Sequence, residues 1–158
     1  METRTLTDVL RDHPFLEGLR PNQIQKIAEL AMEVQFSRDQ LVFREGDESS
    51  LFYLLLSGKI ALEISAPGKI IRIQTLGAGD ELGWSSLLGG DGKTFQARAL
   101  EAVRAIAFDA ARLRQTFDQD TAFGYQFMQR LIKVVARRLQ AARMQLLDVY
   151  APGGAKMA

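Results

Sequence analysis

The sequence predicts an α+β domain in which short helices precede a small roll of β-strands and a long helix follows it. Apolar residues have helical spacing over 5–32, short apolar runs alternate with turn residues over 34–108, and helical spacing returns over 109–150. A chain of 158 residues, 47% of them hydrophobic, suits one domain with a substantial core. We therefore expect residues 1–158 to form a single domain.

Composition and charge narrow the classes of protein. Twenty Lys and Arg balance nineteen Asp and Glu, so no strong net field favours nucleic acid or a membrane surface. The chain has no cysteine and one histidine, His13, which excludes disulfides, iron–sulfur clusters and multi-histidine metal sites. No apolar run approaches the roughly 20 residues of a membrane span, and no signal peptide follows Met1. We expect a cytoplasmic protein without a metal.

The first segment, 5–32, reads as short helices. Thr7 is a candidate N-cap for the first helix, which His13-Pro14 interrupts because proline disfavours a helical residue before it. Pro21 suits the first turn of a second helix, where its missing N–H costs nothing. We expect this second helix to have one apolar side, formed by Ile24, Ile27, Ala28, Leu30 and Ala31.

The middle segment, 34–108, reads as strands. Residues typical of turns, mostly Gly, Asp and Pro, separate the apolar runs at 45–47, 57–58, 66–68, 77–80 and 89–92. Many short strands at regular spacing are typical of a small barrel or sandwich. The predicted strands are 41–43, 51–56, 59–64, 69–76, 95–100 and 103–108.

The last segment, 109–150, reads as two helices. Asp109 is a candidate N-cap for a short helix to Phe117, and a helix about 45 Å long then covers 121–150. A row of Phe127, Leu131 and Val134 widens the apolar face of its first half only. A heptad seam continues to the end, which predicts a homodimer through this helix; the alternative is a helix packed along its own domain. The seam residues are Met128, Ile132, Val135, Leu139, Ala142, Leu146 and Val149.

Four motifs in this order of elements carry a family resemblance. They are 45–47 followed by 52–58, 79–83, 97–101 and 136–140. Together they resemble the cyclic-nucleotide-binding domain of the Crp/Fnr family, in a form without the helix-turn-helix. The resemblance implies a jelly-roll-like β-roll that encloses a cyclic nucleotide such as cAMP or cGMP. It also implies a glutamate on the ribose, an arginine on the phosphate followed by Ser or Thr, and a long helix that contacts the base.

Several of these implied contacts are altered in this chain. Gly83 matches the motif glycine, but Trp84 falls where the family has the ribose glutamate. Lys93 falls on the phosphate arginine, with Thr94 on the hydroxyl that follows it. On the long helix the base-contacting position falls on Ala142, with Arg143 beside it.

The residues of this candidate pocket each have a second interpretation. Trp84 either stacks on a base or fills the pocket. Lys93 either binds a phosphate or is a solvated lysine in a glycine-rich loop. Ser85 and Ser86 either cap a short helix or donate to an anion. Arg98 is a substitute cation if its strand face lines the cavity, and otherwise an ordinary exposed residue.

The expected function is a sensor rather than an enzyme, because no nucleophile–base pair or carboxylate pair follows from the spacing. Such a sensor binds a cyclic nucleotide or another small anion and signals through the long helix to an unidentified protein. One alternative is a ligand-free interaction module whose pocket Trp84 fills. Another is a partner that heterodimerises with a full-length Crp/Fnr transcription factor. Only eight residues follow Tyr150, so we expect no direct DNA binding.

Overall fold

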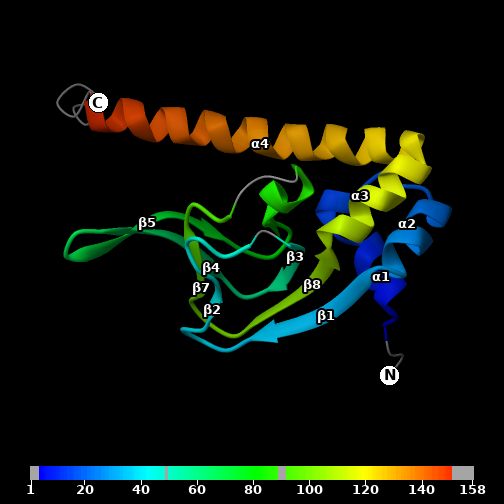
Figure 1. Cartoon of the computed structure of the whole chain (residues 1–158), viewed down its shortest axis with the longest axis horizontal. Helices are drawn as coiled ribbons and strands as arrows, with labels where there is room; N and C mark the ends of the chain where they lie inside the picture. Colours follow the sequence, from blue (N-terminus) through cyan, green and yellow to red (C-terminus); the bar gives the residue numbers. More distant parts are fainter. Residues whose placement is uncertain (1–3, 49, 89–91, 151–158) are drawn as a thin grey trace.

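The computed structural model describes residues 4–48, 50–88 and 92–150, and it shows two antiparallel sheets rolled against each other below a long helix (Figure 1). The first sheet has the strand order β1-β8-β3-β6 and the second the order β2-β7-β4-β5. The strands are β1 (Ala31–Phe36), β2 (Leu41–Phe43), β3 (Leu51–Ser57), β4 (Ile60–Ala66), β5 (Lys69–Leu76), β6 (Glu81–Leu82), β7 (Gln96–Ala99) and β8 (Val103–Asp109). The predicted α+β roll is confirmed.

The N-terminal segment differs from the sequence expectation in two details. Thr5, not Thr7, caps α1 (Leu6–Arg11), because its hydroxyl accepts the Asp8 N–H while the Asp8 carboxylate accepts the Thr5 N–H. After the short 3₁₀ helix η1 (Pro14–Leu16), helix α2 (Pro21–Ala28) ends earlier than expected. Ala31 begins β1 instead of ending the helix, because pairing with β8 gives its backbone a partner strand.

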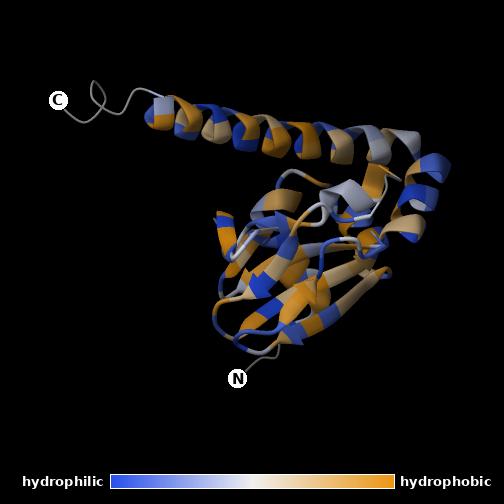
Figure 2. Cartoon of the chain, turned by 60° about the vertical axis from the view of Figure 1, so that its left-hand side comes forward, coloured by the Kyte–Doolittle hydropathy of each residue, from blue (hydrophilic) through white to orange (hydrophobic). Residues whose placement is uncertain are grey.

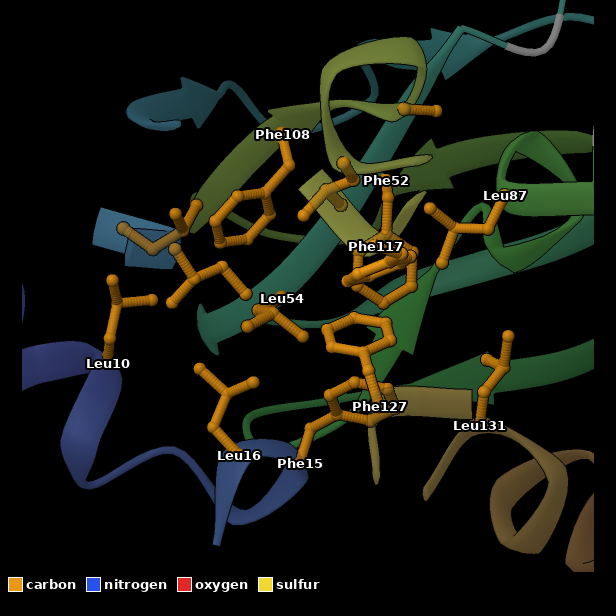
Figure 3. Packing of buried hydrophobic residues seen from close by; sticks show 14 of the residues in the cluster. Leu10, Phe15, Leu16, Phe52, Leu54, Leu87, Phe108, Phe117, Phe127 and Leu131 are labelled. Atoms are coloured by element: carbon orange, nitrogen blue, oxygen red, sulfur yellow. The ribbon is translucent and has the colours of Figure 1, made fainter. Parts of the chain in front are cut away.

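Two apolar clusters form the core. One fills the roll between the sheets, and the other joins the N-terminal helices, the outer face of β3 and β8, and the C-terminal helices. In this second cluster Phe127 stacks edge-on against Phe15 and Phe52, with ring centroids 5.2 and 5.9 Å apart (Figure 3). This cluster fixes the start of the long helix against the roll. It therefore also sets the position of the side chains in the next helical turns.

The long helix has a buried half and an exposed half. The long helix is α4 (Thr121–Tyr150). It follows the short helix α3 (Ala110–Gln119), which Asp109 caps as predicted. Phe127 and Leu131 are buried, whereas every residue from Leu139 to Tyr150 is exposed. Apolar bands nevertheless continue along this exposed part, which projects over and beyond the roll (Figure 2). Within the described ranges, no helix combines the length and apolar character needed to cross a membrane.

Candidate ligand-binding site

A cavity of about 240 Å³ lies where the segment after β6 faces the start of β7 and the underside of α4. The 3₁₀ helix η2 (Trp84–Leu88) forms one wall. Five of the residues predicted for the pocket, Gly83, Trp84, Ser85, Lys93 and Thr94, line this cavity together. The other lining residues are Leu62, Leu82, Gly92, Phe95 and Arg138.

Gly83 opens this wall in a conformation that other residues rarely adopt. Its φ is +84°, in the left-handed region. A Cβ here would lie 2.7 Å from the backbone oxygen of Leu51 and 3.4 Å from Nζ of Lys93. Glycine therefore brings the β6–η2 connection close to β3 and leaves room for the lysine.

Lys93 is held inside the protein rather than in solvent. Its N–H donates to the Asp47 carbonyl at 2.9 Å, and its carbonyl accepts the Gly46 N–H at 2.8 Å, so the loop before β3 fixes its backbone. The side chain is 7% exposed, and its Nζ lies 4.5 Å from the centre of the Phe43 ring. The interpretation of Lys93 as a solvated loop lysine is wrong.

The Lys93 ammonium lacks a hydrogen-bond partner among the described residues. Burial lowers the pKa of this amine, because the charged form loses hydration without gaining an opposite charge. A buried, unpaired cation is costly, and an anion placed beside it would recover much of that cost. This is the main chemical feature of the cavity.

Trp84 and Ser86 also have defined roles. Trp84 is half-buried and packs against the second core cluster while it lines the cavity. Ser86 is buried, and its hydroxyl donates to the Gly83 carbonyl at 2.6 Å, which closes the η2 turn. Ser86 thus stabilises the wall from inside η2 and does not line the cavity; its hydroxyl donates to a carbonyl and accepts no backbone N–H among the described residues, so it is not the cap of this helix.

Arg98 and Arg143 lie away from this cavity. Arg98 donates from Nε to Glu63 at 3.1 Å and from a second nitrogen to the Asp39 carbonyl at 3.2 Å. It alternates along β7 with the buried Ala97 and Ala99, so it lies on the opposite face of the strand from the core. Arg143 is exposed on the projecting part of α4. Neither arginine supplies the substitute cation.

The cation that sequence reasoning missed is Arg138. It follows Phe127, Leu131 and Val134 along the face of α4 that packs on the roll, and it lines the cavity. Its guanidinium forms an ion pair with the Glu81 carboxylate and donates to the Glu81 carbonyl at 2.8 Å. The spacing of that helical row was the signal that placed Arg138 toward the roll.

Glu81, on β6, is buried beside Arg138 and lines the neighbouring groove rather than this cavity. Its residue is 2% exposed, and burial raises the pKa of its carboxyl even though Arg138 opposes the shift. The pair therefore links β6, beside Gly83, to the middle of the long helix. It is the one ion pair between α4 and the roll among the described residues.

A larger cavity of about 760 Å³ lies between α1 and the first sheet. Two of its charged pairs are satisfied internally, since Arg4 pairs with Asp12 and Arg104 pairs with Glu33. An anion there would have to compete with these carboxylates. The cavity at Lys93 is the better candidate because its lysine is buried and has no partner in the part of the chain that the structure describes.

These features agree with a comparison against known families. The model of the cyclic nucleotide-binding domain family matches residues 33–120, more than half of the chain. This protein therefore belongs to the cyclic nucleotide-binding domain family.

Known relatives support the same assignment. The chain is 27% identical over 145 residues to the CRP-like cAMP-activated global transcriptional regulator of Mycobacterium tuberculosis, covering 91% of this chain and 63% of the regulator's length. A solved Geobacter metallireducens structure assigned to the cyclic nucleotide-binding class has 29% identity and a TM-score of 0.74, covering 82% of this chain and 95% of that one. The N-terminal domain of a Streptomyces coelicolor transcriptional regulator has 26% identity and a TM-score of 0.66, covering 88% and 95%.

Proposed function

We propose that this protein is a sensory domain that binds a small anion, a cyclic nucleotide or a compact anionic ligand of similar chemistry, in the cavity at Lys93. The observation that supports this function is the buried Lys93 ammonium, which has no hydrogen-bond partner within the described ranges. Trp84 offers an aromatic wall and Thr94 a hydroxyl in the same cavity. The relative from M. tuberculosis is described as cAMP-activated, which makes cyclic AMP the first ligand to test.

The long helix is the proposed output of the sensor. At about 240 Å³ the cavity is smaller than the roughly 300–1,000 Å³ typical of small-molecule sites. A cyclic nucleotide would therefore displace part of the wall, and α4 contributes to that wall through Arg138. A ligand that binds one position of α4 better than another shifts the population toward that position.

The test is thermal unfolding with and without millimolar cyclic AMP or cyclic GMP. A ligand at 100 times its dissociation constant stabilises the folded state by about 2.7 kcal/mol, which is a readily measured shift. We expect the shift to vanish in Lys93→Met, whereas the unliganded variant should be at least as stable as wild type because it buries no charge.

The matched control is Lys59→Met, which removes an exposed lysine at the β3–β4 turn and should keep the full shift. A wild type that no cyclic nucleotide stabilises would contradict the nucleotide-sensor function. The panel should then be extended to smaller anions before the binding function is rejected.

A second candidate function is an interaction module without a ligand. The observation that favours it is the position of Trp84, which both packs on the core and occupies space beside the cavity. Replacing Trp84 by Ala separates the two functions. In a sensor this change alters nucleotide affinity, whereas in an interaction module it alters only stability.

We also propose that two copies pair through α4. The seam residues Ile132, Leu139, Leu146 and Val149 are between 51% and 68% exposed, although they repeat at heptad spacing. Such a row is unfavourable in water, and a second copy of the same helix offers the matching surface. The heterodimer with a full-length family member would use the same seam.

A further inference from the structure

The charges around the cavity differ in how they are compensated. Lys93 and Arg138 are the ionisable side chains that line it. Arg138 is already paired with Glu81, whereas Lys93 forms no ion pair with a carboxylate of the described residues. Among these described groups, two cations and one carboxylate leave one uncompensated positive charge.

We propose that Glu81, through its pair with Arg138, sets the charge of the accepted ligand and makes the pocket selective for monoanions over dianions. This inference rests on the proposed binding of an anion at Lys93. A single negative charge neutralises the site, whereas a second one must compete with the Glu81 carboxylate for Arg138. Phosphodiesters and simple carboxylates carry one charge, and phosphomonoesters carry nearly two at neutral pH.

The position of Glu81 makes this selectivity strong. The carboxylate is nearly fully buried, so water screens its field poorly compared with that of an exposed acid. Arg138 also fixes the position of Glu81 through two contacts. One guanidinium nitrogen of Arg138 contacts both the carboxylate and the backbone carbonyl of Glu81. A dianion therefore meets a fixed negative charge rather than a side chain that swings away.

Other charged groups near the pair do not cancel this effect. The Asp80 carboxylate accepts the Gly77 N–H at 2.8 Å and adds to the negative field at Glu81. Arg137 also acts on Glu81, and both side chains line the neighbouring groove rather than this cavity, so Glu81 acts on the cavity through Arg138, which lines both. Asp47 and Glu48 line a small cavity on the other side of Lys93, and the Asp47 carboxylate accepts the Arg44 N–H.

The inference is tested with two pairs of probes that differ in charge and little else. Dimethyl phosphate and cyclic AMP carry one charge, and methyl phosphate and 5′-AMP carry nearly two at pH 8, since the second phosphate pKa is near 6. Titration calorimetry or phosphorus NMR at constant ionic strength measures the affinity of each probe. We expect wild type to prefer the monoanion of each pair by roughly tenfold.

Glu81→Gln adds one uncompensated positive charge and is expected to raise the affinity for the dianion roughly tenfold relative to that for the monoanion. Arg138→Gln removes a cation and should change the ratio in the opposite direction. The control Glu17→Gln removes an exposed acid from the neighbouring groove and should leave the ratio unchanged.

If Glu81 had a purely structural role, Glu81→Gln would lower the affinities for the monoanion and the dianion equally. An unchanged ratio of the two affinities would therefore overturn the inference. If Glu81→Gln does not fold, the opposite change in Arg138→Gln decides the question. If binding requires Lys93 but the ratio of monoanion to dianion affinity is unchanged in both Glu81→Gln and Arg138→Gln, this inference is overturned while the proposed function stands. If none of the four probes binds wild type, the proposed function fails with it.

Discussion

At the scale of single residues, the buried ionisable groups Lys93 and His13 have opposite surroundings. Lys93 has no hydrogen-bond partner among the described residues, whereas both ring nitrogens of His13 form hydrogen bonds. Nδ1 of His13 accepts the Phe15 N–H at 3.1 Å, and Nε2 lies 3.0 Å from the Leu55 carbonyl, to which it donates. Protonation of Nδ1 would remove the bond accepted from Phe15, whereas the donation from Nε2 to Leu55 on β3 would remain.

Stability should fall as the pH drops below about 6.5. Burial lowers the pKa of His13 from its usual 6.5, so the unfolded chain binds the proton more readily than the folded one. The contribution is complete above pH 6.5 and is lost as the pH falls through the lowered pKa. Its slope cannot exceed about 1.4 kcal/mol per pH unit, the limit for one proton.

Urea unfolding at pH 7.5 and pH 5.5 measures this effect. The comparison variant is His13→Asn, whose side chain can still accept the Phe15 N–H but does not titrate. Because His13 is the one histidine in the chain, the difference in slope between the two proteins belongs to it. Equal slopes would show that His13 is not linked to folding.

At the scale of elements, the two halves of α4 differ in burial and in contacts. The first half is fixed by aromatic contacts to η1, β3 and α3, among them Phe117 and Phe127 with ring centroids 4.8 Å apart. The next turns carry Arg138 to the cavity, and the last turns are exposed. Under the proposed sensor function, a movement at the cavity would be transmitted to the exposed half while the buried half acts as a fixed end.

Two aromatic residues of α4 test how strongly the first half is fixed. Phe127 is fully buried, and we expect Phe127→Ala to reduce the free energy of unfolding by about 3–5 kcal/mol. Tyr125 in the same helical turn is 67% exposed, and Tyr125→Ala should change it by about 0.5 kcal/mol or less. Denaturant titrations of both variants decide this, and similar losses would contradict the assignment of α4's buried face.

At the scale of the whole molecule, the exposed seam predicts self-association. Leu139→Arg places a charge at the centre of the proposed dimer helix, where two copies would bring like charges together. We expect sedimentation to show a dimer for wild type and a monomer for this variant. Gln140→Arg adds the same charge one position off the seam and should remain dimeric. A monomeric wild type would end the proposal.

Much of the fold was predictable because local patterns carried it. Periodicity and capping residues gave the bounds of α4 and the start of α3, and turn residues separated the strands at nearly the observed positions. The N-terminal cap and the end of α2 were missed by a few residues. There, Thr5 and Thr7 offer the same cap chemistry, and strand pairing with β8 decides where the helix stops.

Less of the site was predictable, because burial and pairing depend on segments far apart in the chain. The resemblance to the family motif predicted that Gly83, Trp84, Ser85, Lys93 and Thr94 share one pocket, and they line the same cavity. The sequence did not decide whether Lys93 is solvated or buried, since the loop at residues 44–47 and the Phe43 ring enclose it. It favoured Arg98 as an ordinary strand residue over a substitute cation, but it did not predict the ion pair with Glu63 on β4.

The sequence by itself determined the class of fold, the family motifs and the apolar seam along the long helix, because each is written in spacing along the chain. Tertiary structure decided which cations serve the cavity. Arg138 reaches it from α4, 57 residues beyond its partner Glu81, once the aromatic cluster has laid the helix across the roll. The charge of the site is therefore a property of packed elements, since a field at a buried position depends on distance and burial rather than on sequence order.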